Sequence, residues 1–343
     1  MAVRHVPAEF TSIQDAVNQS APGDTIRVAG GVYGESVTIP ADRDRLAIIG
    51  SGQENVILQG DGTGVGLTIS GSGHVTIAGL TVTGFATGIQ VDTDDNIIRD
   101  VTVTGCGGDG IFVSPTGARN LFLRVAATNN GADGIEISGV VNYVIDCEFV
   151  GNGDDGIDIN ASGNLVVSTQ ASGNGSSGLD TVGNNTLAVG NRFVGNGRGM
   201  RAVSGGGSLV VGNFISRNRT VGGEFVNAAG GVVLANEVNC NQGQGLRFDG
   251  GGGFKVIRNE VENNGAQGID LAGSLSLSLF DDNEIKENDA AGIRLAGGAA
   301  GNAVRRNELN RNRPDLEAEP PADVRNVFDE NRCKRSQPPR LCC

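Results

Sequence analysis

Carboxylate side chains recur at matched places in neighbouring segments of this sequence. Glu136, Asp158 and Asp180 each follow a glycine by two residues, and Asp133 and Asp155 stand just before two of those glycines. Carboxylates about 5 Å apart repel each other by roughly 1 kcal/mol in water and by about 3 kcal/mol at an effective dielectric constant near 20. A bound cation, raised carboxyl pKa values or side chains turned into water would offset that repulsion.

Hard oxygen ligands on a semi-flexible surface suit Ca²⁺. We therefore expect a substrate- or ion-binding site whose residues are Asp133, Glu136, Asp155, Asp158 and Asp180, with the first four as calcium ligands. No other cofactor is expected. A solvated acidic face without an ion is the alternative, and Asp155 with Asp158 or Asp180 also offers the acid and base of a two-carboxylate hydrolase.

Arginines follow the acidic residues along the chain. Arg201 lies one repeat beyond Asp180, and Arg198 lies at the turn before it. We expect either guanidinium to bind a substrate carboxylate. Beyond them the same position alternates in sign through Glu224 and Arg247, which predicts ion pairs between neighbouring strands.

The element that must position these residues is a short strand that follows a glycine. Eleven glycines precede an apolar-x-apolar strand at intervals of 21 to 24 residues, and they are Gly66, Gly88, Gly110, Gly134, Gly156, Gly178, Gly199, Gly222, Gly245, Gly268 and Gly292. Alternation in each strand places the apolar residues inward and the residue between them outward. One coil cannot bury its own apolar face, so the repeats predict a solenoid in which coils stack.

Two columns of small polar residues accompany the glycines. The column nearest the glycine is Cys106, Asn130, Asn152, Asn174, Asn196, Asn218, Asn241, Asn264 and Asn288, and a second column runs from Cys147 and Thr169 to Asn283. Asparagine tolerates the left-handed conformation that sharp corners need, and its stacked amides can form a hydrogen-bonded ladder. We expect both roles here. On the outward strand positions, Phe112 and Phe248 are the aromatic candidates for stacking on sugars.

The ends of the chain read as caps. Residues 1–24 are expected to form an N-terminal cap with an amphipathic helix, in which Thr11 to Gln14 fits a capping box. Residues 25–332 are expected to form the β-helix, and residues 333–343 a cysteine-rich tail. Among the tail cysteines a Cys333–Cys342 disulfide is favoured, with metal binding that includes Cys343 as the alternative.

The composition of the chain limits the classes of molecule that it is expected to bind. The formal net charge is -13, which opposes nucleic-acid binding. No apolar stretch approaches the roughly 18 residues that span a bilayer, and no signal peptide is visible at the N-terminus. We nevertheless expect an extracellular, cell-surface or spore-surface location. The ends of the solenoid and the terminal cysteines are expected routes to oligomers.

The opening FTSIQDAV…PGDTIRVAGGVYGESVTI and coils such as GNGDDGIDI resemble right-handed parallel β-helix proteins of the pectate-lyase-like superfamily, in its carbohydrate-binding and sugar-hydrolase subgroup. The resemblance covers nearly the whole chain and implies an all-β solenoid of about 12–13 coils with a short N-terminal capping helix. It also implies a polysaccharide partner. In lyases of this kind Ca²⁺ bridges protein and uronate carboxylates while an Arg or Lys abstracts the C5 proton, so Arg201, Arg198 and Asp180 become catalytic candidates.

Signatures of particular activities are absent from the sequence. The Asn-Thr-Asp, Gly-His-Gly and Arg-Ile-Lys segments of polygalacturonases, the Gly-Phe-Gln-Asp segment of pectin esterases and the Asp-Pro-His segment of alginate epimerases do not occur. Two functions therefore stay open. One is a protein that binds an acidic polysaccharide through the acidic strand face, and that as an enzyme would be lyase-like or glycoside-hydrolase-like. The other is a non-catalytic structural solenoid of an envelope, spore or tail.

Overall fold

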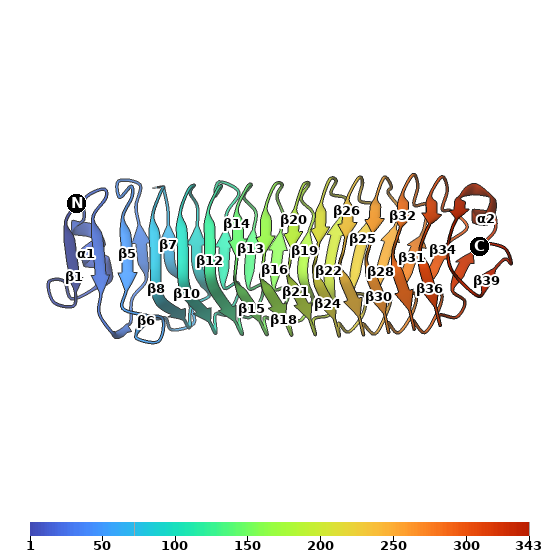
Figure 1. Ribbon diagram of the computed structural model, residues 1–343. Coiled ribbons are helices and arrows are strands. Elements are labelled where there is room, and N and C mark those ends of the chain that lie inside the picture. Colours follow the sequence, from blue (N-terminus) through green and yellow to red (C-terminus); the bar gives the residue numbers. More distant parts are fainter. Residues whose placement is uncertain (72, 343) are drawn as a thin grey trace. The chain divides into compact units, whose positions relative to one another are not determined.

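The computed structural model describes residues 1–71 and 73–342. These residues form two compact units, unit 1 from Met1 to Gly175 and unit 2 from Ser176 onward, and both are wound from parallel strands (Figure 1). The helices of the described residues are two short ones, α1 (Ile13–Gln19) and α2 (Ala322–Arg325). The all-β parallel solenoid predicted from the repeats is thus confirmed.

Each coil of unit 1 contributes to two parallel sheets. The first sheet contains β1 (Val3–Val6), β2 (Thr25–Val28), β3 (Gly31–Tyr33), β5 (Ala47–Gly50), β6 (Val56–Gln59), β8 (Thr76–Thr83), β10 (Ile97–Thr104), β12 (Leu121–Thr128), β14 (Tyr143–Ile145), β15 (Glu148–Val150), β17 (Leu165–Val167) and β18 (Gln170–Ser172). The second sheet contains β4 (Val37–Ile39), β7 (Val65–Ile69), β9 (Thr87–Val91), β11 (Ile111–Val113), β13 (Ile135–Ile137) and β16 (Ile157–Ile159).

Unit 2 repeats this arrangement. Its first sheet contains β20 (Leu187–Val189), β21 (Arg192–Val194), β23 (Leu209–Val211), β24 (Phe214–Ser216), β26 (Val232–Leu234), β27 (Glu237–Asn239), β29 (Lys255–Ile257), β30 (Glu260–Glu262), β32 (Leu279–Asp281), β33 (Glu284–Lys286), β35 (Ala303–Arg305), β36 (Glu308–Asn310) and β38 (Val327–Asp329). Its second sheet contains β19 (Ser177–Thr181), β22 (Arg198–Val203), β25 (Gly223–Val226), β28 (Leu246–Asp249), β31 (Ile269–Ala272), β34 (Ile293–Leu295), β37 (Leu316–Ala318) and β39 (Ser336–Gln337).

The number of strands in the second sheet gives the number of coils, because each coil adds one strand to it. Among the described residues, six such strands lie in unit 1 and eight in unit 2, slightly more than the 12–13 coils expected. The glycine repeat does not reveal the coils of β37 and β39, because neither strand is preceded by glycine.

The asparagine columns form ladders between coils. The backbone N–H of Asn241 donates to Oδ1 of Asn264 at 3.1 Å, and its Nδ2 donates to the same oxygen at 3.0 Å. The Nδ2 of Asn241 also donates to the carbonyl of Ile215, one coil back, at 3.2 Å. These asparagines are almost fully buried. The ladder therefore satisfies backbone groups at a corner that no regular strand pairing reaches.

The left-handed conformation does not belong to the ladder asparagines, contrary to the expectation. It belongs to the residue immediately before each one, such as Arg217 (φ 56°) before Asn218 and Cys240 (φ 55°) before Asn241. The ladder positions need asparagine for its amide, which bonds to two neighbouring coils. The corner before them accepts arginine and cysteine because the surrounding hydrogen bonds hold the backbone there.

The glycine column is coupled to the asparagine column. A Cβ on Gly245 would lie 2.9 Å from Nδ2 of Asn264 and 2.6 Å from the carbonyl oxygen of Gly268. Real Cβ atoms do not approach that closely, so glycine is required where the next ladder amide fills the corner.

The core of unit 2 contains stacked aromatic rings. The ring centroids of Phe225 and Phe248 are 4.8 Å apart, and Phe248 also makes edge contacts with Phe254 and Phe280. The expectation that Phe248 lies on the outward face is therefore wrong, because it is the second inward residue of β28 and is 0% exposed. Phe112 does face outward and is half-buried.

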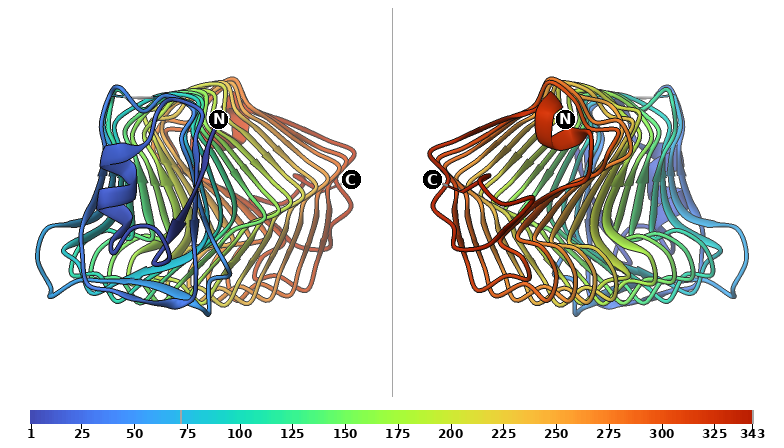
Figure 2. Two further views of the ribbon diagram at one scale, coloured as in Figure 1. Left: turned by 90° about the vertical axis from the view of Figure 1, so that its left-hand side faces the viewer. Right: turned by 90° about the vertical axis from the view of Figure 1, so that its right-hand side faces the viewer.

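Helix α1 lies beside the first coils of unit 1 and buries Ile13, Ala16 and Val17 (Figure 2). Its N-cap is Ser12, which accepts a hydrogen bond from the Asp15 N–H at 3.0 Å, one residue later than the expected capping box. Gln14 instead accepts from the Thr38 N–H at 2.7 Å and so ties the helix to β4.

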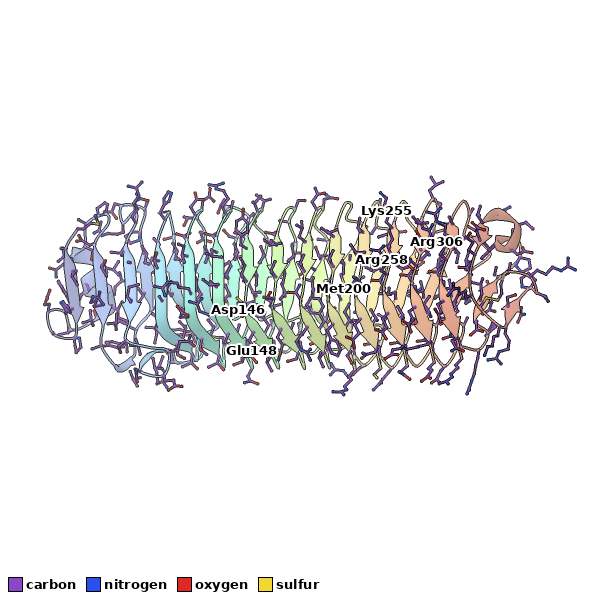
Figure 3. The ribbon with its side chains drawn as sticks, in the orientation of Figure 1. Asp146, Glu148, Met200, Lys255, Arg258 and Arg306 are labelled. Atoms are coloured by element: carbon purple, nitrogen blue, oxygen red, sulfur yellow. A yellow bond between two sulfur atoms is a disulfide. The ribbon has the colours of Figure 1, made fainter. Side chains whose placement is uncertain are left out.

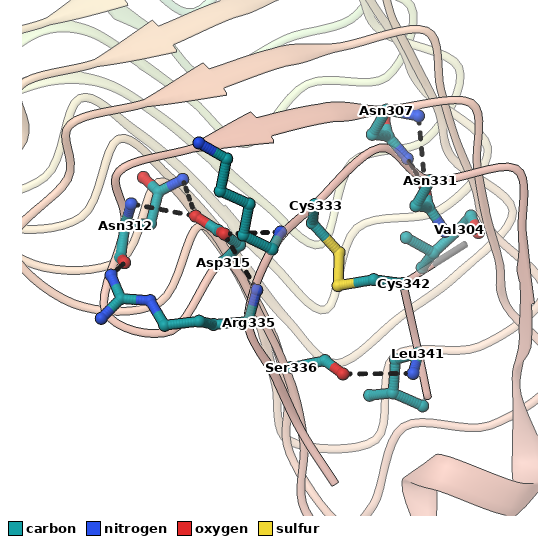
Figure 4. Close-up of a disulfide and its surroundings, with 11 residues drawn as sticks. Val304, Asn307, Asn312, Asp315, Asn331, Cys333, Arg335, Ser336, Leu341 and Cys342 are labelled. Atoms are coloured by element: carbon teal, nitrogen blue, oxygen red, sulfur yellow. Dashed lines mark hydrogen bonds between the residues drawn. A yellow bond between two sulfur atoms is a disulfide. The ribbon is translucent and has the colours of Figure 1, made fainter. Parts of the chain in front are cut away.

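The last coil of unit 2 contains the favoured Cys333–Cys342 disulfide (Figure 4). Close to it, the asparagine ladder of the column nearest the glycines ends on a carboxylate. The N–H of Asn312 donates to Oδ1 of Asp315 at 3.0 Å, and the other oxygen of Asp315 accepts from the N–H of Lys334 at 3.0 Å. Cys343, the alternative metal or disulfide partner, lies outside the described residues.

Candidate functional site

The second sheet of unit 1 presents a polar outward face. Phe112 on β11, Glu136 on β13 and Asp158 on β16 are register partners on successive coils, so three of the predicted outward positions do line up. Glu136 accepts a hydrogen bond from Ser138 at 3.2 Å, and Asp158 accepts one from Asn160 at 2.7 Å. Neutral donors from the same strands or their ends thus reach both carboxylates.

A second row of carboxylates runs along the corner that precedes these strands. The N–H of Asp133 donates to Oδ1 of Asp109 at 3.1 Å, and the N–H of Asp155 donates to Oδ1 of Asp133 at 2.8 Å. Each carboxylate therefore accepts the backbone N–H of the aspartate one coil further on. This ladder fixes the carboxylates in place, as the asparagine ladder fixes its amides.

The two rows meet around Asp133. One oxygen from each of Asp109, Asp133 and Glu136 lies within 4.8 Å of the others, and the same holds for Asp133, Asp154 and Asp155. Asp133 and Asp155 are buried, at 9% and 8% exposure, whereas Asp154 is exposed. Asp133 is shared by both groups and is the centre of what we call the acid cluster, made of Asp109, Asp133, Glu136, Asp154 and Asp155.

Burial raises the pKa of Asp133 to about 8, and the charges of Asp158, Asp155 and Asp109 act in the same direction. The hydrogen bond from the Asp155 N–H opposes the shift only in part. Desolvation and like charges both favour the neutral carboxyl. A divalent cation among these oxygens would reverse that balance, since it favours the ionised form.

The predicted ion-binding set is therefore brought together in unit 1 around Asp133, with Glu136, Asp155 and Asp158 near it. The spacing of the cluster and its all-oxygen donors fit Ca²⁺, which takes carboxylates in flexible arrangements. Asp180, the fifth predicted member, belongs to unit 2.

Asp180 opens a row of alternating charges on the second sheet of unit 2. Its carboxylate accepts from Arg201 at 3.3 Å, and Arg201 also reaches Glu224 at 3.7 Å. Arg198, the other predicted arginine, pairs with the same Glu224 at 3.4 Å. Burial raises the pKa of Asp180, and the charge of Arg201 opposes that shift.

The alternation continues as the sequence predicts. Arg247 lies 3.0 Å from Glu224 and 4.0 Å from Asp270, and Arg294 lies 3.0 Å from Asp270 on its other side. Asp270 is only 3% exposed, so burial raises its pKa although both arginines lower it. This row is an ion-pair ladder in which each charge has opposite neighbours.

Sequence reasoning missed a second set of stacked carboxylates on the first sheet of unit 2. Glu237, Glu260, Glu284 and Glu308 are register partners on successive coils. Their signal was an Asn-Glu dipeptide repeated in these four coils, in which the asparagine is the ladder residue and the glutamate is the first outward residue of the next strand.

Two larger hollows lie on the surface of the described residues. One in unit 1, of about 500 Å³, is lined by Glu35, Asp61, Thr63 and Phe85 among others. One in unit 2, of about 730 Å³, is lined by Asp282, Asn283, Glu284, Arg306, Glu308, Glu330 and Arg332. Neither hollow includes a residue of the acid cluster.

The family model for the right-handed β-helix region matches residues 63–215 and 179–309. A search of curated protein sequences finds no match. No helix of the described part of the chain is long and apolar enough to cross a membrane.

Several solved structures share the fold. The A-module of mannuronan C-5 epimerase AlgE6 from Azotobacter vinelandii is 15% identical, with 94% of each chain covered and a TM-score of 0.67. The catalytic domain of the GH87 alpha-1,3-glucanase is 13% identical over 97% of this chain and 68% of that one, with a TM-score of 0.64. Tailspike protein 2 from Escherichia coli O157:H7 bacteriophage CAB120 is 13% identical over 71% of this chain and 40% of that one, with a TM-score of 0.63.

Proposed function

We propose that this chain, which belongs to the right-handed β-helix family and has the pectate-lyase-like fold, binds an acidic polysaccharide through Ca²⁺ held at the acid cluster of unit 1. The observation that carries the proposal is the convergence of carboxylate oxygens on Asp133, which is buried and has a raised pKa. A polysaccharide with uronate groups would be repelled by this surface alone. A cation between the two sets of carboxylates makes the contact attractive.

The shape of the surface supports a polymer over a small molecule. The outward residues of β11, β13 and β16 form an open row, and Phe112 offers an aromatic face beside Glu136. An extended chain can contact several coils of such a row, whereas a small ligand would gain little burial. The named activities of the epimerase and the glucanase, which share only the fold, are consistent with a carbohydrate partner.

Calorimetric titration with CaCl₂ tests the metal, and electrophoresis through gels containing alginate or polygalacturonate tests the polymer. Wild-type protein should bind Ca²⁺ and be retarded in Ca²⁺ but not in EDTA, and Asp133→Asn should lose both effects. Asp146→Asn is the matched control, because Asp146 is exposed at another corner of the same unit (Figure 3). No heat at millimolar Ca²⁺, or equal retardation of both variants, would count against the proposal.

The catalytic part of the proposal concerns Arg201, Arg198 and Asp180 of unit 2. Arg201 forms ion pairs with Asp180 and Glu224, Arg198 forms one with Glu224, and a guanidinium presents a planar set of N–H donors that matches a carboxylate. That favours binding of a substrate carboxylate over acceptance of the C5 proton. Release of unsaturated uronates from pectate, alginate or glycosaminoglycans, followed by ultraviolet absorbance and lost in Arg201→Gln, would support lyase activity.

A structural solenoid of an envelope, spore or tail is the second candidate. The observation that favours it is the regular spacing of 21 to 24 residues between the eleven glycine-marked coils, which leaves little chain in those coils for loops that would wall a deep cleft. Absence of Ca²⁺ and polymer binding, together with no release of unsaturated uronates, would favour this function. The disulfide and the fold agree with an extracellular or surface location, where the ends of the chain could mediate oligomers.

A further inference from the structure

The first sheet has an uncovered outer strand in each unit. In unit 1 this strand is β1, which pairs in parallel with β2, and in unit 2 it is β38, which pairs in parallel with β35. Among the described residues, neither strand has a partner on its other side. Val3 on β1 is 51% exposed and Val327 on β38 is 61% exposed. The N–H and C=O groups of an open strand edge can pair with another chain.

On β1, the open edge is formed by Val3 and His5. The carbonyls of Ala2 and Val6 accept N–H groups from the coil of β2, both at 2.9 Å. Alternate residues of a parallel strand turn their backbone groups to the same side, so those of Val3 and His5 point away from β2. The carbonyl of His5 accepts from the N–H of Glu9 at 2.8 Å in the turn that follows. The N–H of His5 and both backbone groups of Val3 have no hydrogen-bond partner within the described residues.

On β38, the open edge is formed by Phe328. The N–H of Val327 donates to the preceding coil at 2.8 Å, and the carbonyl of Asp329 accepts from that coil at 3.0 Å. The same alternation turns the N–H and C=O of Phe328 away from β35. Neither group has a hydrogen-bond partner in the part of the chain that the structure describes. Both outer strands therefore offer the donors and acceptors that one further parallel strand needs.

The second sheet of unit 1 has a protected outer strand instead. Gln14 of α1 accepts from the N–H of Thr38 on β4 at 2.7 Å and donates to the carbonyl of Thr38 at 3.2 Å. Its side-chain amide thus takes the place of a neighbouring strand. Proteins commonly cover exposed sheet edges to prevent such pairing. No described side chain hydrogen-bonds in this way to the open edges of β1 and β38, so these two edges are available to a partner.

The residues on the two open edges match each other. In a parallel pair one residue bonds to two alternate residues of its partner, here Phe328 to Val3 and His5. Val3 then lies opposite Val327. Both valines are exposed, so their contact removes apolar surface from water. His5 lies opposite Asp329, and its imidazole can donate a hydrogen bond to that exposed carboxylate.

Charge favours pairing of β1 with β38 over pairing of like strands. β1 carries Arg4 and His5, whereas β38 carries Asp329 and is followed by Glu330. Two copies of β38 would bring acidic groups together, and like charges opposite each other on paired strands are destabilising. The net charge of -13 opposes association at long range, but exposed charges more than about 8 Å apart are largely screened at physiological salt.

We propose that β38 of one molecule pairs in parallel with β1 of a second copy of this chain, head to tail. The first sheet then continues across the joint, with Val327 beside Val3 and Asp329 beside His5. Because the two surfaces differ, the joint leaves one open edge of each kind, and association can continue beyond two molecules. No residue of the acid cluster takes part, so the inference stands or falls independently of polysaccharide binding.

Sedimentation velocity of the full chain over a range of protein concentrations tests the proposal. We expect weak, concentration-dependent association with a Kd on the order of 0.1 mM, because the joint adds few contacts. EDTA in the buffer excludes Ca²⁺ bridges between acid clusters. Iodoacetamide blocks exposed free thiols beforehand, so that no intermolecular disulfide forms.

Asp329→Lys and His5→Glu should each weaken self-association about fivefold, since each replaces an attractive contact by like charges. An equimolar mixture of the two variants should associate as the wild type does, because their new charges are opposite. Val3→Pro should weaken association without lowering the melting temperature, because the lost N–H faces away from β2 and proline is tolerated at the first residue of an edge strand. Glu148→Lys is the control, because Glu148 is an exposed residue of the inner strand β15 (Figure 3).

A single monomer boundary at every concentration would overturn the proposal. Self-association of Asp329→Lys and Val3→Pro equal to that of the wild type would do the same, as would a mixture of the two charge variants that stays monomeric. An effect of Glu148→Lys as large as that of Asp329→Lys would also overturn it, because net charge and not the joint would then control association.

Discussion

Replacement of Asp133 by asparagine should make unit 1 more stable, and only above acidic pH. The carboxyl is buried at 9% exposure, and its pKa is raised from 3.8 to about 8. Asparagine has nearly the same shape and keeps the oxygen that accepts the Asp155 N–H at 2.8 Å. The substitution therefore removes the titration while it retains the hydrogen bond of the ladder.

The sign of this stability change follows from the protonation of Asp133 in the folded and the unfolded chain. Below pH 3.8 Asp133 is protonated whether the protein is folded or unfolded. Between that pH and about 8 the unfolded chain has lost the proton and the folded chain still holds it, so unfolding releases a proton and stability falls as pH rises. Above about pH 8 the loss is complete.

The size of the pKa shift sets an upper limit on the change in the free energy of unfolding. About four pH units correspond to about 5.5 kcal/mol. We expect about 2–3 kcal/mol, because the carboxyl borders solvent and its exposed neighbour Asp154 can turn outward. Asp133→Asn should thus match the wild type near pH 4 and exceed it by about 2–3 kcal/mol near pH 9.

Urea denaturation followed by far-ultraviolet circular dichroism, in EDTA and at several pH values, measures this difference. Asp146→Asn changes the charge equally outside the acid cluster and should show no such growth with pH. A stability difference that is constant across pH, or an Asp133→Asn protein less stable than wild type near pH 9, would refute the reasoning. Added Ca²⁺ should reverse the order at high pH, because it stabilises only the ionised wild-type site.

Three further outcomes follow from unit 2. In urea denaturation, Gly245→Ala should destabilise the protein by about 2 kcal/mol or more, because its Cβ would lie 2.9 Å from Nδ2 of Asn264. The control Gly34→Ala in unit 1 should be nearly neutral, because its Cβ would have nothing within 4 Å. Asn264→Ala should lower the free energy of unfolding by about 2–4 kcal/mol, since it removes the oxygen that accepts from the N–H and Nδ2 of Asn241. A melting temperature equal to that of the wild type would contradict a stabilising role of the ladder. Arg247→Met should destabilise by about 2 kcal/mol near pH 7 and by less as the pH falls, because burial raises the pKa of Asp270 and protonation removes the charge that Arg247 pairs with. A loss independent of pH would show that packing and not charge is responsible.

Much of the architecture could be predicted because the repeat has a physical cause. The glycine and asparagine columns recur together, as Gly245 and Asn264 show. The side-chain amide of Asn264 occupies the space that a Cβ on Gly245 would need. The reason first assigned to the asparagines was incomplete, since the left-handed residue is the one before them. A sequence column shows that a position is constrained, and only the coordinates show whether the backbone or the side chain imposes the constraint.

The candidate sites were predicted unevenly. Alignment on the glycines displays the outward face of the second sheet, so Glu136, Asp158 and the alternating arginines were visible. The row of Glu237, Glu260, Glu284 and Glu308 lies on the first sheet, whose strands follow the asparagines, so an alignment on the glycines does not reveal it. The raised pKa of Asp133 depends on how the coil of Asp155 covers it, which no single repeat encodes.

In unit 2, the asparagine ladder of the column nearest the glycines runs in one direction and ends at a defined residue. Every N–H along it donates to the oxygen of the following coil until Asn312, which donates to Asp315 of its own coil. A coil in the middle is consequently interchangeable with its neighbours, whereas the coil that holds Asp315 is not. Unit 2 should therefore tolerate the excision or duplication of one complete repeat upstream of Asn312, and its length is a quantity that evolution or an engineer can change in whole steps.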